Sequence, residues 1–215
     1  MKKMLFVYNP RSGKGLISHH LPDILNTFTS AGNDVIAHPT QAPLDAFNTV
    51  MRLAGDCDVV VCSGGDGTLN ETIKGLQSFA PEKRPLLGYI PAGTMNDFAS
   101  SLKIPKIMTE AAKCIVSGEP KMLDIGGFND QYFTYIAAFG AFTDVSYMTS
   151  QQLKNIFGTL AYIMEGAKRL GEIKGYKMKV VTDDTEIEDT FIYGMVSNSK
   201  SVGGMKHLSV DDVLM

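Results

Sequence analysis

The sequence has 215 residues, of which 44% are hydrophobic and 20% are charged, and its formal net charge is −3. This length can bury a hydrophobic core and suits one large domain or two smaller ones. The negative charge argues against nucleic acid as a partner, because binding to a phosphate backbone requires a basic surface. The three cysteines are scattered, which fits a reducing cytoplasm, and no stretch approaches the roughly 18 apolar residues of a membrane span.

Short apolar runs alternate with helical periodicities in the first half of the chain. Residues 59–62 are apolar throughout, which is typical of a central strand in a parallel sheet that is covered on both faces. The alternation predicts a doubly wound α/β domain. Strands are predicted over residues 4–8, 34–38, 59–62 and 86–90, and helices over residues 16–30, 42–53, 68–79, 95–102 and 109–117.

The second half of the chain has a different texture. Longer β segments are predicted over residues 132–136, 177–182 and 189–196, and an amphipathic helix over about residues 150–170. We therefore predict an α/β domain over residues 1–122. A partial β-rich domain with a helical insertion is predicted over residues 123–215.

Three glycine-rich turns follow predicted strands, at residues 9–15, 63–68 and 91–97. Each combines glycine, a hydroxyl residue and the start of a helix. Because the carboxyl ends of parallel strands share one edge of a sheet, we expect the three turns to meet there. Glycine permits close approach of the backbone to a ligand, and the first N–H groups of a helix favour anions. The turns therefore predict a binding site for nucleotide phosphates.

Helix capping is an alternative interpretation of the hydroxyl residues in these turns. Ser12 suits an N-cap position, and Thr68-x-x-Glu71 has the spacing of a capping box. Thr94-x-x-Asp97 resembles one more loosely. The first turn, NPRSGKG, also lacks the GxxxxGK[ST] spacing of a Walker A motif. Capping and ligand binding are compatible, so both interpretations stay open for these residues.

Asp66 lies in the middle of the second turn, between Gly65 and Gly67. A carboxylate repels phosphate, so a cation is expected to mediate between them. Capping does not account for the glycines that surround this residue.

The three turns NPRSGKG, GGDGTLNE and PAGTMNDFA, in this order and spacing, resemble the diacylglycerol kinase catalytic domain family, which includes bacterial lipid kinases and sphingosine kinases. The GGDGT element alone is shared with NAD kinases and 6-phosphofructokinases. Residues 197–199 and 203–206 resemble a later motif of the family. The resemblance implies a nucleotide-binding α/β domain of the NAD kinase and phosphofructokinase type, followed by a β-sandwich.

The resemblance also implies a reaction and a set of site residues. The reaction is the ATP- and Mg²⁺-dependent phosphorylation of a lipid hydroxyl, foremost that of diacylglycerol to give phosphatidic acid. Asp66 would be the catalytic residue and would act at the magnesium ion. The implied nucleotide contacts are Asn9, Pro10, Ser12, Gly13, Lys14, Thr40, Gly64, Gly65, Gly67, Thr68, Asn70 and Thr94.

The end of the sequence departs from the family pattern. An acidic stretch of the form PDAxxDDG normally binds a structural magnesium ion, and Asp212 corresponds to its first aspartate. The rest of that stretch, and the family's general-base glutamate, have no counterpart in these 215 residues. We therefore expect an incomplete β-sandwich and a truncated chain, which alone would be an inactive fragment.

A lipid kinase meets its substrate at a membrane surface. The basic residues between positions 151 and 179 first suggest the solvated face of a core-packed helix, and they also suit peripheral contact with the inner face of the membrane. We expect a cytoplasmic protein without a nucleic acid partner, and an exposed sandwich edge would allow a homodimer. Two alternatives stay open: a soluble-substrate kinase of the NAD kinase type, and a non-catalytic homologue that binds nucleotide or lipid.

Overall fold

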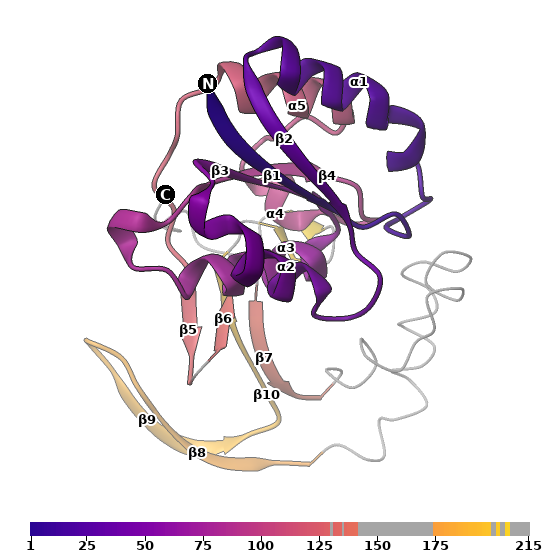
Figure 1. The fold of residues 1–215 in the computed structure, drawn as a ribbon. Coiled ribbons are helices and arrows are strands. Elements are labelled where there is room, and N and C mark those ends of the chain that lie inside the picture. Colours follow the sequence, from indigo (N-terminus) through magenta and orange to yellow (C-terminus); the bar gives the residue numbers. More distant parts are fainter. Residues whose placement is uncertain (130, 135, 142–173, 199–200, 203–204, 207–215) are drawn as a thin grey trace. The chain divides into compact units, whose positions relative to one another are not determined.

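The computed structural model of the protein describes residues 1–129, 131–134, 136–141, 174–198, 201–202 and 205–206 (Figure 1). The chain forms two compact units. The first comprises Met1–Tyr135 together with the chain from Ser197 onward, and the second comprises Ile136–Val196.

The first unit is built on a parallel sheet of four strands in the order β2-β1-β3-β4. Tyr8 at the end of one strand lies opposite both Pro39 and Ser63, and Ser63 lies opposite Ile90. All four strands therefore end at the same edge, as the α/β pattern predicts. Their bounds are β1 Lys2–Tyr8, β2 Asn33–Pro39, β3 Val59–Gly64 and β4 Leu86–Pro91.

Helices cover both faces of this sheet (Figure 1). Helices α1 and α5 lie on one face, and α2 and α3 lie on the other. The short helix α4 follows β4. The bounds are α1 Ile17–Ser30, α2 Asp45–Leu53, α3 Asp66–Gln77, α4 Asp97–Ser101 and α5 Met108–Ser117, with short 3₁₀ turns at Ala54–Asp56 and Pro81–Lys83.

The alternation of side chains along β1 explains this double cover. Met4 and Phe6 pack in the cluster that contains residues of α1 and α5, whereas Leu5 and Val7 pack with residues of α2 and α3. Successive side chains of a strand point to opposite faces, so an apolar run buries both faces at once. Every residue of β3 is buried, which confirms its predicted central position.

The β segments beyond α5 form pairs of short strands. In the first unit β5 (Gly126–Phe128) pairs with β6 (Gln131–Phe133), and β11 (Ser201–Val202) pairs with β12 (Met205–Lys206). In the second unit β7 (Ile136–Gly140) pairs with β10 (Tyr193–Ser197), and β8 (Tyr176–Val181) pairs with β9 (Glu186–Phe191). These small sheets agree with the expected incomplete β-rich region.

The single strand predicted over residues 189–196 is wrong in detail. The structure has two strands there, which separate at Ile192, because β9 pairs with β8 while β10 pairs with β7. The helix predicted over residues 150–170 lies outside the described residues. The boundary predicted at residue 122 stays a prediction, and β5 and β6, which follow it, belong to the first unit.

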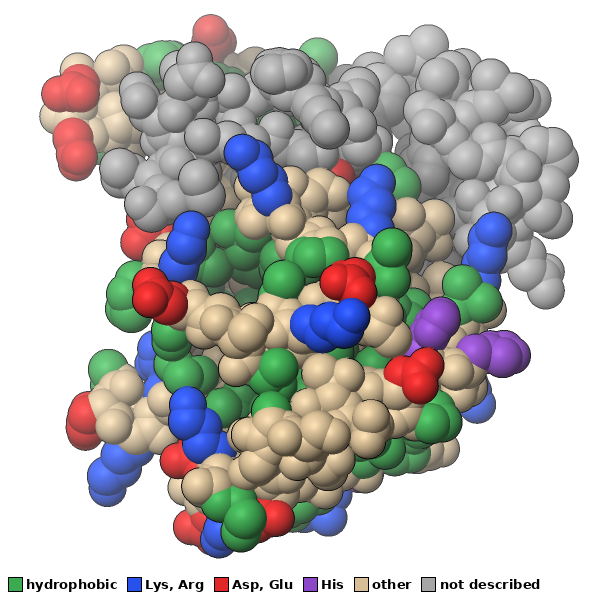
Figure 2. All heavy atoms as spheres, turned by 90° about the horizontal axis from the view of Figure 1, so that it is seen from above, with side chains coloured by type: hydrophobic (Ala, Val, Ile, Leu, Met, Phe, Trp, Pro, Cys, Tyr) green, Lys and Arg blue, Asp and Glu red, His purple; other side chains and the backbone are tan. Residues whose placement is uncertain are grey.

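The surface of the described residues carries mixed charge. Figure 2 shows lysine and arginine side chains interspersed with aspartate and glutamate on one face of the molecule. Among the helices that the structure describes, none combines the length and the apolar content needed to cross a bilayer.

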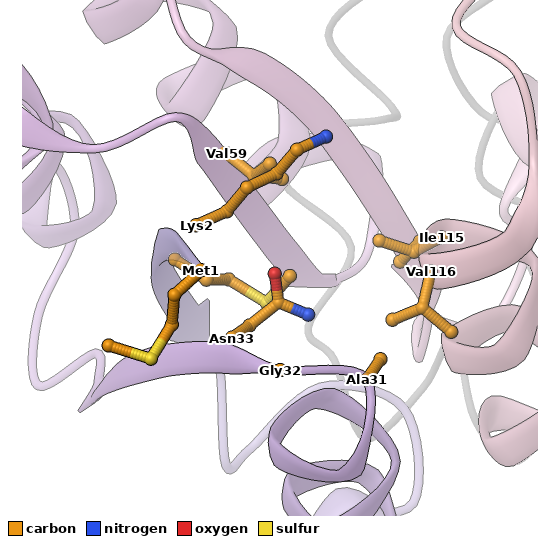
Figure 3. A pocket seen from close by; sticks show the side chains of 9 residues that line it. Met1, Lys2, Ala31, Gly32, Asn33, Val59, Ile115 and Val116 are labelled. Atoms are coloured by element: carbon orange, nitrogen blue, oxygen red, sulfur yellow. The ribbon is translucent and has the colours of Figure 1, made fainter.

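A hollow of about 260 Å³ lies at the amino-terminal edge of the parallel sheet (Figure 3). Lys2, Asn33 and Val59 come from the first residues of three strands, and Ile115 and Val116 come from α5. The side-chain Nδ2 of Asn33 donates to the Phe28 carbonyl, 3.0 Å away. This hollow lies at the opposite ends of the strands from the glycine-rich turns, so it is not part of the site that they form.

Candidate functional site

The strand order places the topological switch point of the sheet between β1 and β3. The chain runs from β1 outward to β2 and then returns past β1 to β3 and β4. Such a reversal separates the connections on either side of it, and ligands of open α/β sheets bind at this position, beyond the carboxyl ends of the strands. The first turn begins at Asn9, directly after β1. The second turn, predicted at residues 63–68, overlaps the end of β3, because Ser63 and Gly64 are the last two residues of that strand.

Asn9 joins the first turn to the second. Its backbone N–H donates to the Ser63 carbonyl at 2.8 Å, and its side-chain amide donates to the Thr68 hydroxyl at 3.2 Å. Its side-chain oxygen accepts the N–H of Arg11 at 2.9 Å, which bends the chain back at once. The structure thus brings together two of the predicted nucleotide contacts, Asn9 and Thr68. The hydrogen bond between their side chains fixes the orientation of both.

Tyr89 and Asn96 join the second turn to the third. The Gly64 carbonyl accepts the N–H of Ala92 at 2.9 Å and the hydroxyl of buried Tyr89 at 3.0 Å. The Asn96 side chain accepts the N–H of Gly93 at 2.9 Å and donates to the Gly93 carbonyl at 2.8 Å. The Tyr89 hydroxyl also lies 3.4 Å from the Asn96 side-chain oxygen. No local pattern in the sequence marks Tyr89 or Asn96 as a site residue, because their role depends on contact between turns.

The glycines of the three turns allow the turns to pack against one another. A Cβ atom at Gly93 would lie 2.5 Å from Cα of Gly65, and one at Gly13 would collide with the carbonyl of Ala92. Gly13 also has a φ of +57°, which favours glycine. By contrast, a Cβ atom at Gly67 would meet nothing within 4 Å. Close approach to a ligand therefore explains Gly67 better than Gly13 or Gly93.

The capping interpretation is wrong for all three turns. Helix α3 begins at Asp66, before Thr68, and the residues that precede α1, α3 and α4 make no capping bond through their side chains. Thr68 accepts the Asn9 amide, and a carboxylate oxygen of Glu71 accepts the N–H of Leu44 at 3.0 Å. Thr68 and Glu71 therefore connect α3 to other segments of the chain.

Asp66 is the first residue of α3, and its side chain is partly buried. One carboxylate oxygen accepts the N–H of Phe98 over a long 3.5 Å. Burial raises the pKa of Asp66, because it removes water from the ionised carboxylate, and the negative charge of Asp97 raises it further. Asp97 is itself 3% exposed. Its spacing from Thr94 suggested only a cap, although Asp97 is the second acid of the three turns.

The two carboxylates fit a hard cation. Mg²⁺ prefers oxygen ligands, and a positive charge beside Asp66 and Asp97 would offset both the burial and the mutual repulsion that raise the Asp66 pKa. Asp212, the other predicted magnesium ligand, lies outside the described residues. The part of the chain that the structure describes contains no group of three or more His, Cys, Asp or Glu side chains placed to hold a metal ion, so the magnesium site stays a prediction.

Two buried polar atoms at the site have no hydrogen-bond partner among the described residues. They are the Ser63 hydroxyl oxygen, at the end of β3, and the side-chain oxygen of Asn70. Asn70 lies one helical turn after Asp66, so the two side chains lie on the same face of α3. A buried acceptor without a partner costs about 1–3 kcal/mol. Ser63 is 0% exposed, so only the Asn70 oxygen bears on the face of α3 that carries Asp66.

The remaining predicted contacts lie around the same edge. The N–H of Thr40 donates to the Tyr8 carbonyl at 2.8 Å, so Thr40 extends the pairing of β2 with β1. Lys14 and Thr94 are exposed, and Pro10 and Ser12 are partly buried. Ser199, Gly203 and Gly204 of the later motif lie outside the described residues. The nucleotide contacts assigned by resemblance stay predictions.

Comparison with known proteins identifies the family. The model of the diacylglycerol kinase catalytic domain matches residues 3–128, more than half of the chain. The chain belongs to the diacylglycerol kinase catalytic domain family. This assignment confirms the resemblance inferred from the three turns, and the match includes all of them.

Named relatives match over nearly the whole chain. The diacylglycerol kinase of Bacillus subtilis (strain 168) is 35% identical over 216 aligned positions, which cover 100% of this chain and 71% of the relative. That of Staphylococcus saprophyticus is 36% identical and is covered over 68% of its length. A crystal structure of a diacylglycerol kinase from Bacillus anthracis superposes with a TM-score of 0.77 at 29% identity, over 95% of this chain and 67% of the other. The fold is therefore the one found in diacylglycerol kinases.

Proposed function

We propose that the protein is a lipid kinase that transfers the terminal phosphate of ATP to the hydroxyl of diacylglycerol and so forms phosphatidic acid. The observation that carries the proposal is the meeting of three glycine-rich turns around Asp66, within the part of the chain that matches the family. Kinase and transferase activity follow from the family, and the named relatives favour diacylglycerol as the acceptor.

The chain's own residues would contribute mainly positioning and charge. The first N–H groups of α3 have no acceptor within the helix, and they lie at the edge where the phosphates are expected. Asn9 and Asn96 keep the neighbouring turns in place through their side-chain amides. Phosphoryl transfer depends chiefly on such positioning and on neutralisation of charge.

Asp66 and Asp97 would hold a magnesium ion, which when bound neutralises the charge of the phosphates. A carboxylate with a raised pKa gains from a nearby cation, which stabilises its ionised form. In this proposal Asp66 binds the metal and does not touch the phosphates directly, which explains why an acid lies in an anion-binding turn.

A phosphate-transfer assay tests the proposal. The full chain is incubated with labelled ATP, Mg²⁺ and either diacylglycerol in mixed micelles or NAD, and ATP binding is measured by calorimetry. Label in phosphatidic acid supports the lipid kinase. Label in NADP would instead establish the soluble-substrate kinase. ATP binding without transfer to either acceptor is the result expected both of an inactive fragment and of the non-catalytic homologue, and the same assay on a longer chain that includes the family's general-base glutamate separates these two. The family assignment favours neither the soluble-substrate kinase nor the non-catalytic homologue.

The lipid substrate implies a place in the cell. We propose a cytoplasmic protein that meets its acceptor at the inner face of the membrane and that assembles as a homodimer. Lys168 and Arg169 would contribute to the membrane contact; they lie outside the described residues. Sedimentation with anionic liposomes should decrease when both are changed to glutamate, and unchanged sedimentation would exclude this surface. Chromatography with light scattering measures the number of chains in the assembly.

A further inference from the structure

The connection between β2 and α2, residues 40–44, lies at the same sheet edge as the glycine-rich turns. Its first residue, Thr40, donates its N–H to the last carbonyl of β1, that of Tyr8, at 2.8 Å. The first turn starts at the next residue, Asn9. The connection and the first turn are therefore neighbours across β1.

Local hydrogen bonds stabilise the conformation of this connection. A carboxylate oxygen of Asp45 accepts the N–H of Gln41 at 2.7 Å and lies 3.4 Å from Nε2 of His38. The side chain of Gln41 donates to the Pro39 carbonyl at 3.0 Å. These bonds join residues 38–45 to one another, but none of them reaches the helix that carries Asp66.

Glu71 is the described side chain that hydrogen-bonds this connection from α3. One of its carboxylate oxygens accepts the N–H of Leu44 at 3.0 Å, across 27 positions of the sequence. Leu44 has a φ of 65°, in the left-handed region that residues other than glycine adopt at a cost. An acceptor oxygen at this amide stabilises the connection in that conformation.

We propose that Glu71 is a positioning residue, which couples the connection at residues 40–44 to α3 and thereby increases the affinity for nucleotide. Asp66 begins α3, and Glu71 follows it by about one and a half turns. A single rigid helix thus supports the phosphate turn at one point and the Thr40 connection at another. This inference rests on the proposed binding of ATP at this edge.

Such coupling affects nucleotide binding rather than the chemical step. Nucleotide binds to the ordered connection, so its apparent dissociation constant rises in proportion as the ordered fraction falls. At saturating nucleotide the connection is ordered in every molecule, and turnover is then unchanged. A purely structural role would instead lower the thermal stability without any selective effect on nucleotide affinity.

Calorimetric titration of the full chain with MgADP tests the proposal. Glu71→Ala removes the acceptor, and we expect the dissociation constant to rise about fivefold, the equivalent of one hydrogen bond. Glu71→Gln keeps an acceptor oxygen and should stay within about twofold of the wild type. Glu82→Ala, at an exposed glutamate of the same chain, is the matched control and should have no effect.

The outcomes separate this inference from the proposed function. If the wild type does not bind MgADP, the proposed function fails and the inference fails with it. If the wild type binds and Glu71→Ala binds equally well, only the inference is overturned. It is also overturned if Glu71→Gln binds as weakly as Glu71→Ala, because the charge and not the hydrogen bond would then matter.

A measurement on the wild type alone covers the case in which Glu71→Ala does not fold. Amide hydrogen exchange in residues 41–45 should become slower when MgADP is added, because the nucleotide selects the ordered connection. Exchange that stays the same at saturating MgADP would overturn the proposal.

Discussion

Strands β3 and β8 are similar in length and rich in apolar residues, yet their surroundings are opposite. All six residues of β3 are buried between helices on both faces. All six residues of β8 are exposed, including Tyr176 at 45% and Val181 at 63%. β3 lies between two parallel neighbours, whereas β8 has β9 as its one partner among the residues that the structure describes.

This difference shows that apolar content predicts a strand but not how much the strand contributes to stability. An isolated two-stranded sheet is marginal in water, and burial of apolar area provides most of the free energy of folding. In the first unit the same packing that buries β3 also presses the glycine-rich turns together. Substitutions there should have large effects, and substitutions in the β8–β9 sheet should have small ones.

The largest effect on stability is expected at Gly93. A Cβ atom there would lie 2.5 Å from Cα of Gly65 and 2.7 Å from the side-chain oxygen of Asn96, so Gly93→Ala should lower the free energy of unfolding by about 3 kcal/mol in urea titrations. Gly67→Ala is the control. Residue 67 has free space around it and lies in a helix. The free energy of unfolding of Gly67→Ala should therefore rise by up to about 1 kcal/mol, while its affinity for nucleotide falls. Equal stability losses in the two variants would contradict the proposed packing of the turns.

Asp66→Asn separates function from stability in the tightly packed region. Phosphate transfer should fall by about 100-fold or more, because the carboxylate at the metal is lost. The raised pKa means that the folded state binds the Asp66 proton more tightly than the unfolded chain does, so the ionised carboxylate lowers stability at neutral pH. The variant should therefore be at least as stable as the wild type at pH 7.

The pH dependence provides the check on Asp66. The difference in the free energy of unfolding between Asp66→Asn and the wild type should disappear as the pH falls and Asp66 takes up its proton. Asp34→Asn, at an exposed carboxylate, is the control and should change neither phosphate transfer nor the free energy of unfolding. A variant that is clearly less stable than the wild type at pH 7 would argue against the cost assigned to the buried charge.

Val61→Ala tests the core of the parallel sheet. Val61 is 0% exposed and packs in the cluster that contains residues of α1 and α5, so removal of its methyl groups should cost about 2 kcal/mol. Urea denaturation with a two-state fit measures this loss. A cost below about 0.5 kcal/mol would mean that β3 is not the centre of the fold.

The smallest effect is expected in the β8–β9 sheet. Val180 lies opposite Ile187 and is 38% exposed, so Val180→Ala should change the free energy of unfolding by about 0.5 kcal/mol or less. The comparison with Val61→Ala uses the same change of side chain at two degrees of burial. If the two costs were equal, the contrast between β3 and β8 would have to be abandoned.

Local patterns predicted most of the first unit correctly. The apolar run at residues 59–62 and the helical spacing after each turn correspond to β3 and to helices that begin within a few residues of their predicted starts. The pattern was less reliable at residues 189–196, where a continuous β tendency hid the change of partner at Ile192. Which strand a segment pairs with depends on distant residues, and no local pattern contains that information.

At the candidate site, too, local patterns did not reveal contacts between distant residues. The motif placed Asp66 in an anion-binding turn and so predicted a cation beside it. Local spacing also suggested that Glu71 and Asp97 were caps. In the structure Glu71 bonds Leu44, 27 residues away, and Asp97 influences Asp66 from the third turn.

The sequence by itself therefore determined the α/β class, the family and the three turns, because strand and helix periods and short motifs are local properties of the chain. Only the tertiary structure decided how the turns meet. It showed that Gly13 and Gly93 accommodate neighbouring turns, that Tyr89 and Asn96 join them, and that Asp97 is buried beside Asp66. These contacts join segments that are far apart in sequence, and packing of the helices on both faces of the sheet brings them together.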